Sequence, residues 1–294
     1  MAKPKKSPAP RYGIAELYGH CLEDLSADDI RRLASAPKKS QPCPFRGSTC
    51  NKNGGVCSFR LYQPSGSLGI PADEAIVSLC PHRFREAGTV FDWVGRELLG
   101  CAKPTVIREV PFLLGNAGLP EDDPDAVGQI DMVLIDESKP SLHWCALEIQ
   151  AVYFSGEGMP SQFAILREWL GPGLPFPDKN RRPDFRSSGP KRLMPQLQTK
   201  VPTLRRWGKK MAVVVDLPFW KSLGPMDRVA DVSNCDVAWF VVGYERSPNG
   251  FSLVPHSLHL TTLERAVEGL TGGRPVSLNA FETSIRTRLP NSAT

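Results

Sequence analysis

The chain has 294 residues, enough for one large domain or two modest ones with a sizeable core. Its apolar fraction of 41% and charged fraction of 23% are typical of globular proteins and argue against a disordered chain. No run of 18 apolar residues occurs, and the basic start MAKPKKSPAPR lacks the apolar core of a signal peptide, so we expect neither a membrane span nor secretion. We expect residues 1–12 to form a flexible basic tail and the protein to stay in the cytoplasm.

The first structured region is expected at residues 13–87. Residues 14–25 (IAELYGHCLEDL) have apolar side chains at helical spacing and predict an amphipathic helix. Ser26, followed three residues later by Asp29, predicts the capped start of a second helix with the sequence ADDIRRLAS.

Four of the eight cysteines lie in residues 41–80, namely Cys43, Cys50, Cys57 and Cys80. This segment is rich in Gly, Pro, Ser and Asn and looks too polar to form its own core, which is typical of a small metal-stapled module. The spacing C-x6-C-x6-C-x22-C is looser than a pair of CxxC motifs, and four unrelated buried thiols are the alternative. On chemistry alone, zinc is the default metal for four thiolates.

Residues 88–294 alternate helical and strand patterns, which indicates an α/β domain. Thr89 is expected to cap a helix that ends at Gly100, with Val90, Trp93, Val94 and Leu98 on one face. Further strands are expected at residues 105–114, which include Glu109, and at 211–216 and 236–244. Further helices are expected at residues 161–170, 193–207 with interruptions at Pro195 and Pro202, 263–270 and 278–289.

Two more strands, at residues 130–135 and 144–153, are the centre of this domain and are joined by a polar turn that contains Lys139 and Pro140. The first carries Asp131 and the second carries Glu148 and Gln150, which are two residues apart and so share a face. A carboxylate in an apolar strand costs free energy to desolvate and therefore needs a partner or a task. This oxygen cluster suits Mg²⁺, whereas an exposed Asp without chemistry is the alternative for Asp131.

The net charge of +5 is distributed unevenly along the chain. Between Lys179 and Lys210, eleven Lys and Arg residues stand against the single acid Asp184, so this segment carries +10 and the rest of the chain −5. A polyanionic partner is the simplest explanation, and a solvated basic loop without a partner is the alternative.

The order helix, three strands, helix, strand, with acids on the second and third strands, is that of the PD-(D/E)XK nuclease core. The sequence resembles the NotI family of restriction endonucleases in the four-cysteine module before that core, in GQID with Asp131, in EIQAVYFSG with Glu148 and Gln150, and in RPDFRSSGPKRLMPQLQTKVPTLRRWGKK. The similarity extends from about Tyr18 to Val242, and the length is nearest to that of the shorter, EagI-like members.

The resemblance implies a bacterial type II restriction endonuclease with a mixed sheet flanked by helices: a homodimer that uses Mg²⁺ to cut a GC-rich palindrome close to CGGCCG. It also implies iron in the four-cysteine module and a DNA methyltransferase in the same cell that protects the host DNA. Asp131 and Glu148 would hold Mg²⁺, and Glu109 would add a ligand or orient its water, with a surface strand residue that has no role as the alternative for Glu109. Gln150 stands where the commonest nuclease pattern has a lysine and cannot act as a base, so it would position the water.

The expected DNA contacts come from the basic segment: Arg181, Arg182, Arg186, Lys191, Arg192, Gln196, Gln198, Lys200, Arg205 and Arg206. Two other functions fit the same residues: a non-catalytic, metal-stapled DNA-binding protein, and a repair or nicking nuclease with the same core. Mg²⁺-dependent scission of both strands at a palindrome would separate the first function from these two.

Overall fold

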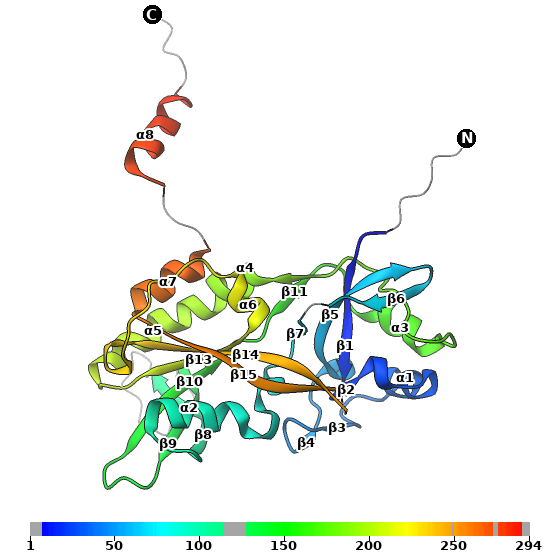
Figure 1. The fold of residues 1–294 in the computed structure, drawn as a ribbon, viewed down its shortest axis with the longest axis horizontal. Coiled ribbons are helices and arrows are strands. Elements are labelled where there is room, and N and C mark those ends of the chain that lie inside the picture. Colours follow the sequence, from blue (N-terminus) through cyan, green and yellow to red (C-terminus); the bar gives the residue numbers. More distant parts are fainter. Residues whose placement is uncertain (1–7, 74, 114–127, 249, 273–275, 290–294) are drawn as a thin grey trace, which may run out of the picture.

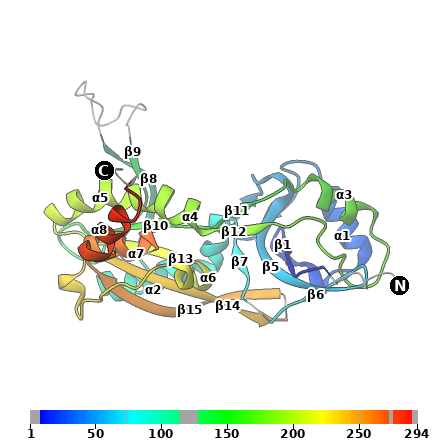
Figure 2. The same cartoon turned by 90° about the horizontal axis from the view of Figure 1, so that it is seen from above.

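The computed structural model describes residues 8–73, 75–113, 128–248, 250–272 and 276–289. They form two lobes, each built on its own β-sheet, with strands β7 (Val77–Ser78), β11 (Tyr153–Ser155) and β12 (Arg182–Asp184) between them (Figures 1 and 2). The larger lobe holds both predicted acidic strands, and the smaller lobe holds three of the four clustered cysteines in its core.

The larger lobe has a six-stranded mixed sheet in the order β15-β14-β13-β10-β9-β8. Its strands are β8 (Thr105–Leu113), β9 (Gly128–Asp136), β10 (His143–Ile149), β13 (Met211–Asp216), β14 (Val237–Ser247) and β15 (Gly250–Thr261). Strand β13 pairs in parallel with β10 and β14, and the other pairs are antiparallel. Every residue of β13 (MAVVVD) is buried, as expected of a parallel strand covered on both faces.

Helices cover both faces of this sheet. Helix α2 (Thr89–Leu99) packs its Val90, Trp93 and Val94 on one face, where the Trp93 ring meets Phe240 edge-on with 4.8 Å between centroids. Helices α5 (Met194–Arg206), α6 (Leu217–Ser222) and α7 (Leu263–Thr271) cover the other face. The predicted helix over residues 89–99 and its end at Gly100 are confirmed, but Thr89 does not cap it. The N-cap is Gly88, which has left-handed φ and ψ, and Thr89 is the first helical residue.

The smaller lobe has a five-stranded sheet of β2 (His20–Cys21), β1 (Arg11–Leu17), β5 (Val56–Ser65), β6 (Leu68–Pro71) and β7. The predicted helix at residues 14–25 is wrong, because residues 14–17 belong to β1 and are buried on both faces, so their apolar spacing reflects a covered strand. Ser26 does begin helix α1 (Ala27–Ala34), and its hydroxyl accepts a hydrogen bond from the Asp29 N–H at 3.1 Å.

The cysteine-bearing segment is not poor in core residues, contrary to the sequence-based expectation. Besides β5 and β6 it contains β3 (Pro42–Cys43), β4 (Ser48–Thr49) and a short 3₁₀ turn, η2 (Asn53–Gly55). Val56, Phe59 and Tyr62 from this segment pack with Ile14 and Leu17 of β1 in one buried cluster. Helix α3 (Pro160–Glu168), from the second half of the chain, adds Phe163 and Leu166 to that cluster.

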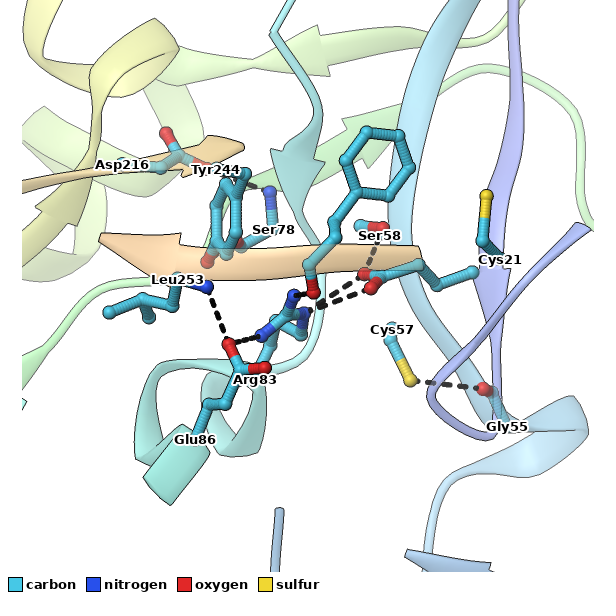
Figure 3. A network of polar contacts seen from close by, with 12 residues as sticks. Cys21, Gly55, Cys57, Ser58, Ser78, Arg83, Glu86, Asp216, Tyr244 and Leu253 are labelled. Carbon is cyan, nitrogen blue, oxygen red and sulfur yellow. Dashed lines mark hydrogen bonds and ion pairs between the residues drawn. The ribbon is translucent and has the colours of Figure 1, made fainter. Parts of the chain in front are cut away.

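A buried polar network joins the two lobes through the 3₁₀ segment η3 (Pro81–Gly88) (Figure 3). The Arg83 guanidinium is fully buried and donates to Glu16 of β1 at 3.0 Å, to Glu86 at 2.7 Å and to the Phe251 carbonyl of β15 at 2.8 Å. Removing one partner of such a buried pair typically costs about 3–5 kcal/mol, since the other charge is left uncompensated. Arg83 therefore fixes η3 firmly against both sheets.

The remaining elements of the larger lobe include α4 (Phe185–Ser188), the π-helical turn η4 (Gly189–Leu193), the 3₁₀ turn η5 (Val232–Asn234) and helix α8 (Leu278–Arg286). No residue of α8 is buried, and the helix stands away from the sheet (Figure 1). Across the described ranges, no helix has both the length and the apolar character needed to cross a bilayer.

Candidate active site

Three acidic residues lie in one row across neighbouring strands. The β9–β10 register pairs Met132 with Leu147, so the next position along the ladder sets Asp131 opposite Glu148. The β8–β9 register pairs Arg108 with Met132 and Val110 with Ile130, which sets Glu109 on the other side of Asp131. The register therefore sets the three predicted acids at neighbouring positions of the sheet, but among the described residues they form no group of three arranged to hold a metal ion. Of the three acids, Lys200 contacts Asp131 and Glu148 alone.

The Glu148 carboxylate is buried and contacts a lysine from helix α5. Its side chain is 3% exposed and accepts a short hydrogen bond from Lys200 Nζ. The same ammonium lies 3.1 Å from Gln196 Oε1 and 4.0 Å from Asp131 Oδ1, while the Asp131 side chain is 52% exposed. The site is thus two carboxylates, one deep and one open to solvent, with a cation between them.

Burial raises the pKa of Glu148 above its ordinary value, and the negative charge of Asp131 raises it further. The Lys200 ammonium opposes this rise. Two neighbouring carboxylates such as Asp131 and Glu148 repel each other unless a cation stands between them. The two carboxylates therefore favour a bound cation, and carboxylate oxygens are the ligands that Mg²⁺ prefers.

Helix α5 supplies Lys200, which the sequence analysis had placed among the DNA contacts rather than in the acid cluster. Leu197, Val201 and Leu204 form the buried face of α5, and Lys200 shares that face with them. Residues three and four apart lie on one side of a helix, so a lysine within this apolar stripe was a signal that its charge had a buried partner.

The strand predicted at residues 144–153 ends earlier, at Ile149, so Gln150 lies one residue beyond the end of β10. Its backbone N–H donates to the Val214 carbonyl at 3.0 Å, and its side-chain amide donates to the Ala151 carbonyl at 2.6 Å. Gln150 is buried beside Glu148 but makes no contact with the carboxylates in the described part of the chain.

Glu109 has a left-handed backbone with a φ of +56°, which is uncommon for a residue other than glycine. At Glu109 the side chains of β8 change the face of the sheet on which they pack. Val106 packs on the α2 side of the sheet, whereas Val110 and Phe112 pack on the α5 side. Such strain costs about 1–3 kcal/mol and is found often at functional sites. The Glu109 side chain is exposed at this turning point, beside Asp131.

The basic segment is divided between a groove and the protein interior. Arg181 is 3% exposed and donates to Gln162 Oε1 at 2.8 Å and to the carbonyls of Glu157 and Gly158, so it holds its own loop together. Arg205 forms ion pairs with Asp236 at 2.5 Å and Glu264 at 3.2 Å. The buried Arg181 is therefore not free to contact DNA, contrary to the expectation from the sequence, whereas Arg205 is exposed with its guanidinium already paired. The exposed members of the predicted set are Arg182, Arg186, Lys191, Arg192, Gln198, Arg205 and Arg206.

Two adjoining hollows form a groove past the acids. One, of about 620 Å³, is lined by Asp131, Lys200, Thr199 and Gln196, and the other, of about 510 Å³, by Gln150, Gln196, Arg192 and Lys52. Gln196 belongs to both. Arg192 overhangs the second hollow, its guanidinium 3.6 Å from the Tyr153 ring centre and 2.7 Å from the Tyr153 hydroxyl.

The four clustered cysteines are all buried, and three of them lie in the core of the smaller lobe: Cys43, Cys50 and Cys57. Burial raises the pKa of Cys57 and of Cys80, and the neighbouring thiols raise both further. Within the described ranges, however, no group of three or more Cys, His, Asp or Glu side chains is arranged to hold a metal ion.

A mixed sheet with two neighbouring carboxylates and a buried lysine beside a basic groove is typical of nucleases, which hydrolyse phosphodiesters. Residues 29–253 match the family described as restriction endonuclease NotI, which covers more than three quarters of the chain. The chain therefore belongs to the NotI family of restriction endonucleases and is a type II site-specific deoxyribonuclease. No curated protein matches its sequence significantly.

Proposed function

We propose that this endonuclease makes Mg²⁺-dependent double-strand cuts in a GC-rich palindrome and that its reaction centre is a PD-(D/E)XK site. The observation that supports this best is the row of Glu109, Asp131 and Glu148 across three strands, with a cation already between two of them. Bound Mg²⁺ would supply positive charge at the scissile phosphate and make the attacking water more acidic.

Each residue of the site has a distinct part in this proposal. Asp131, open to the groove, and Glu148, at its base, would hold the metal. Glu109 would orient a water from the outer side of Asp131. Gln150 has no basic group, so its amide would orient the attacking water by hydrogen bonding. Lys200 would leave Glu148 for the phosphate once the metal is bound and stabilise the negative charge that develops there.

We assign recognition of the DNA sequence to arginines at the groove. Arginine recognises guanine through two hydrogen bonds to O6 and N7, with roughly 1–3 kcal/mol of discrimination per good contact. Arg182, Arg186, Arg192 and Arg206 remain as candidate readers, because Arg181 and Arg205 are already paired within the protein. Three contacts per subunit, used twice by a symmetric dimer, would specify about six base pairs, consistent with a site close to CGGCCG.

A homodimer is part of the proposal, because one centre cuts one strand. Helix α8 exposes Leu278, Phe281 and Ile285, which repeat at helical spacing and have no buried neighbour on their own helix. An apolar hollow around Ile107, Leu142 and Trp207 is likewise open. Exposed apolar surfaces of this kind mark protein interfaces. A cognate DNA methyltransferase would protect the host genome from such an enzyme.

We also propose that Cys43, Cys50, Cys57 and Cys80 bind one structural Fe or Zn ion. Their shared burial supports this, as does the effect of Cys43 and Cys50 on the pKa of Cys80, which requires the thiols to lie near one another. The described side chains do not converge on one point, so metal binding would require them to turn inward. No catalytic step depends on this ion.

The proposed function is tested by incubating the purified protein with unmethylated GC-rich DNA and Mg²⁺ and mapping the ends. We expect both strands to be cut at one palindrome and the activity to vanish with a chelator. Nicks in one strand only would favour a nicking enzyme, and binding without scission would favour a DNA-binding protein.

A further inference from the structure

A cluster of positive side chains stands beside the acid row on the side away from α5, outside the basic segment. Its members are Arg46 in the β3–β4 turn, Lys52 after Cys50, Arg85 in η3 and Arg108 in β8. None of the four has a carboxylate within 4.0 Å among the described residues, although eighteen ion pairs are formed elsewhere in them. Within the described ranges, no carboxylate therefore neutralises their charge.

The fold holds this cluster in place through η3. In a 3₁₀-helix, side chains three residues apart lie above one another, so His82 and Arg85 share a face. Arg83 points the other way, into the buried network with Glu16 and Glu86 (Figure 3). Arg85 is therefore fixed at its backbone, while its Nε is buried without a hydrogen-bond partner in the described structure.

The charges of these side chains act on one another. Burial lowers the pKa of Arg85, the charges of Arg108 and Arg46 lower it further, and the charge of Asp131 raises it. The pKa of His82 is lowered to about 4 by burial and then by four cations: Arg85, Arg46, Lys52 and Arg108. His82 is therefore neutral and adds no charge. The cluster is near enough to Asp131 to sense its carboxylate.

The cluster also faces the groove. Lys52 and Pro81, the residue before His82, line the same hollow as Gln150, Gln196 and Arg192. One wall of the groove thus carries Arg192 of η4, and the opposite wall carries Lys52, which acts on His82 together with Arg46, Arg85 and Arg108. Mutual repulsion of four unpaired cations is unfavourable unless an anion is bound beside them.

We propose that Arg46, Lys52, Arg85 and Arg108 form a binding site for backbone phosphates of DNA on the groove wall opposite helix α5. This proposal rests on the proposed DNA cleavage and adds a second wall that the basic segment does not provide. Phosphate contacts fix the position of the duplex but carry no sequence information. The cluster would therefore set how the scissile bond lies over Asp131 and would not choose the site.

The test uses the exposed Lys52 and Arg108, because replacing the partly buried Arg85 risks misfolding. The double variant Lys52→Gln/Arg108→Gln is compared with wild type and with Arg265→Gln/Arg286→Gln, which removes two exposed charges from α7 and α8. DNA binding is measured by fluorescence anisotropy without Mg²⁺ from 50 to 200 mM salt, on cognate and unrelated duplexes. The log–log salt slope should become shallower by about 1.8 in the groove variant, from about 0.9 per phosphate contact, and stay unchanged in the control.

The ratio of cognate to unrelated binding should not change, since the lost contacts are to phosphates. A groove variant with the wild-type salt slope, while the wild-type protein binds and cuts DNA, would overturn this inference and leave the proposed function intact. A wild-type protein that neither binds nor cuts DNA would overturn both.

Discussion

Lys200 of helix α5 hydrogen-bonds Glu148 of β10, and the same Nζ lies 4.0 Å from Asp131 Oδ1 of β9. Gln150, one residue beyond β10, stands where the commonest pattern of the proposed nuclease core has a lysine. The chain therefore places a lysine ammonium beside its two acids from a different element. In the proposed mechanism, Lys200 provides the positive charge and Gln150 provides the amide.

Replacing Lys200 with Met should reduce cleavage by about 10²–10³-fold, the loss typical of removing one group that stabilises transition-state charge. The same variant should bind Mg²⁺ more tightly in calorimetry, because the ammonium no longer competes for Glu148. Gln196→Ala, which removes a neighbour of Lys200 but no charge, serves as the control and should change metal affinity little. Wild-type cleavage by Lys200→Met would exclude a role for Lys200 in the reaction.

Asp131→Asn and Glu148→Gln should each lower cleavage by about a thousandfold or more, since a metal ligand contributes several kcal/mol at the transition state. DNA binding should be kept or tightened, because each change removes a negative charge near the phosphates. Asp136→Asn is the matched control: Asp136 lies on the same strand but bonds to Ser138 in the β9–β10 turn. Gel-shift and cleavage assays measure the two properties separately.

Much of the larger lobe could be predicted from the sequence, whereas in the smaller lobe only the helices α1 and α3 could, and its sheet could not. A continuous apolar run predicts β13, and apolar residues at helical spacing predict α2. Both elements lie where predicted. In β1, burial on both faces removed the alternation that marks a strand, so its pattern resembled a helix. The β15 strand was not predicted at all, because its exposure pattern alternates irregularly around Pro255.

The candidate site was predicted only as far as single strands carry it. Asp131 and Glu148 follow from an acid within an apolar strand. The pairing of Lys200 with Glu148 joins positions 52 residues apart and depends on how α5 packs, which local pattern does not encode. The same is true of Arg181, whose burial results from the return of its loop to the smaller lobe.

Asp216 gives the protein a pH dependence of stability. It ends β13, is fully buried, and accepts from the Ser78 and Phe219 N–H groups, yet burial raises its pKa to about 6. Between its ordinary value of 3.8 and about 6, the unfolded chain releases the proton while the folded chain keeps it. Stability should therefore fall as the pH rises through this window, by up to about 3 kcal/mol.

The check is urea unfolding of wild type and Asp216→Asn at several pH values from 4 to 7. The Asn variant cannot ionise, so the difference in unfolding free energy between the two should shift against wild type as the pH rises and then level off. A difference that stays constant across this range would show that the two N–H donors offset burial completely.

The cysteine proposal has an elemental readout. Purified protein should contain one Fe or Zn per chain, and Cys57→Ala should lose the metal and much of its stability, because Cys57 lies in the core of the smaller lobe. Cys145→Ala, at an equally buried cysteine in the larger sheet, should lose stability but no metal. Metal-free wild-type protein, or full metal content in Cys57→Ala, would leave four core thiols as the correct description.

Sequence recognition is the last prediction, and Arg192 is the residue that tests it. Its guanidinium packs on the Tyr153 ring beside the hollow that Gln150 lines, so the side chain is held in one orientation at the groove. Arg192→Ala should relax the choice of base at one symmetric pair of positions, by about 10–100-fold at roughly 1–3 kcal/mol per contact. Cleavage of a library carrying single substitutions in the site measures this. Arg205→Ala is the control and should keep full specificity, because the ion pairs of Arg205 with Asp236 and Glu264 hold this side chain away from the groove.

If Arg192→Ala weakened the binding of all sequences alike, Arg192 would be a phosphate contact. Cut sites that were asymmetric or rich in A·T pairs would refute both the palindrome and the reading of guanine by arginine.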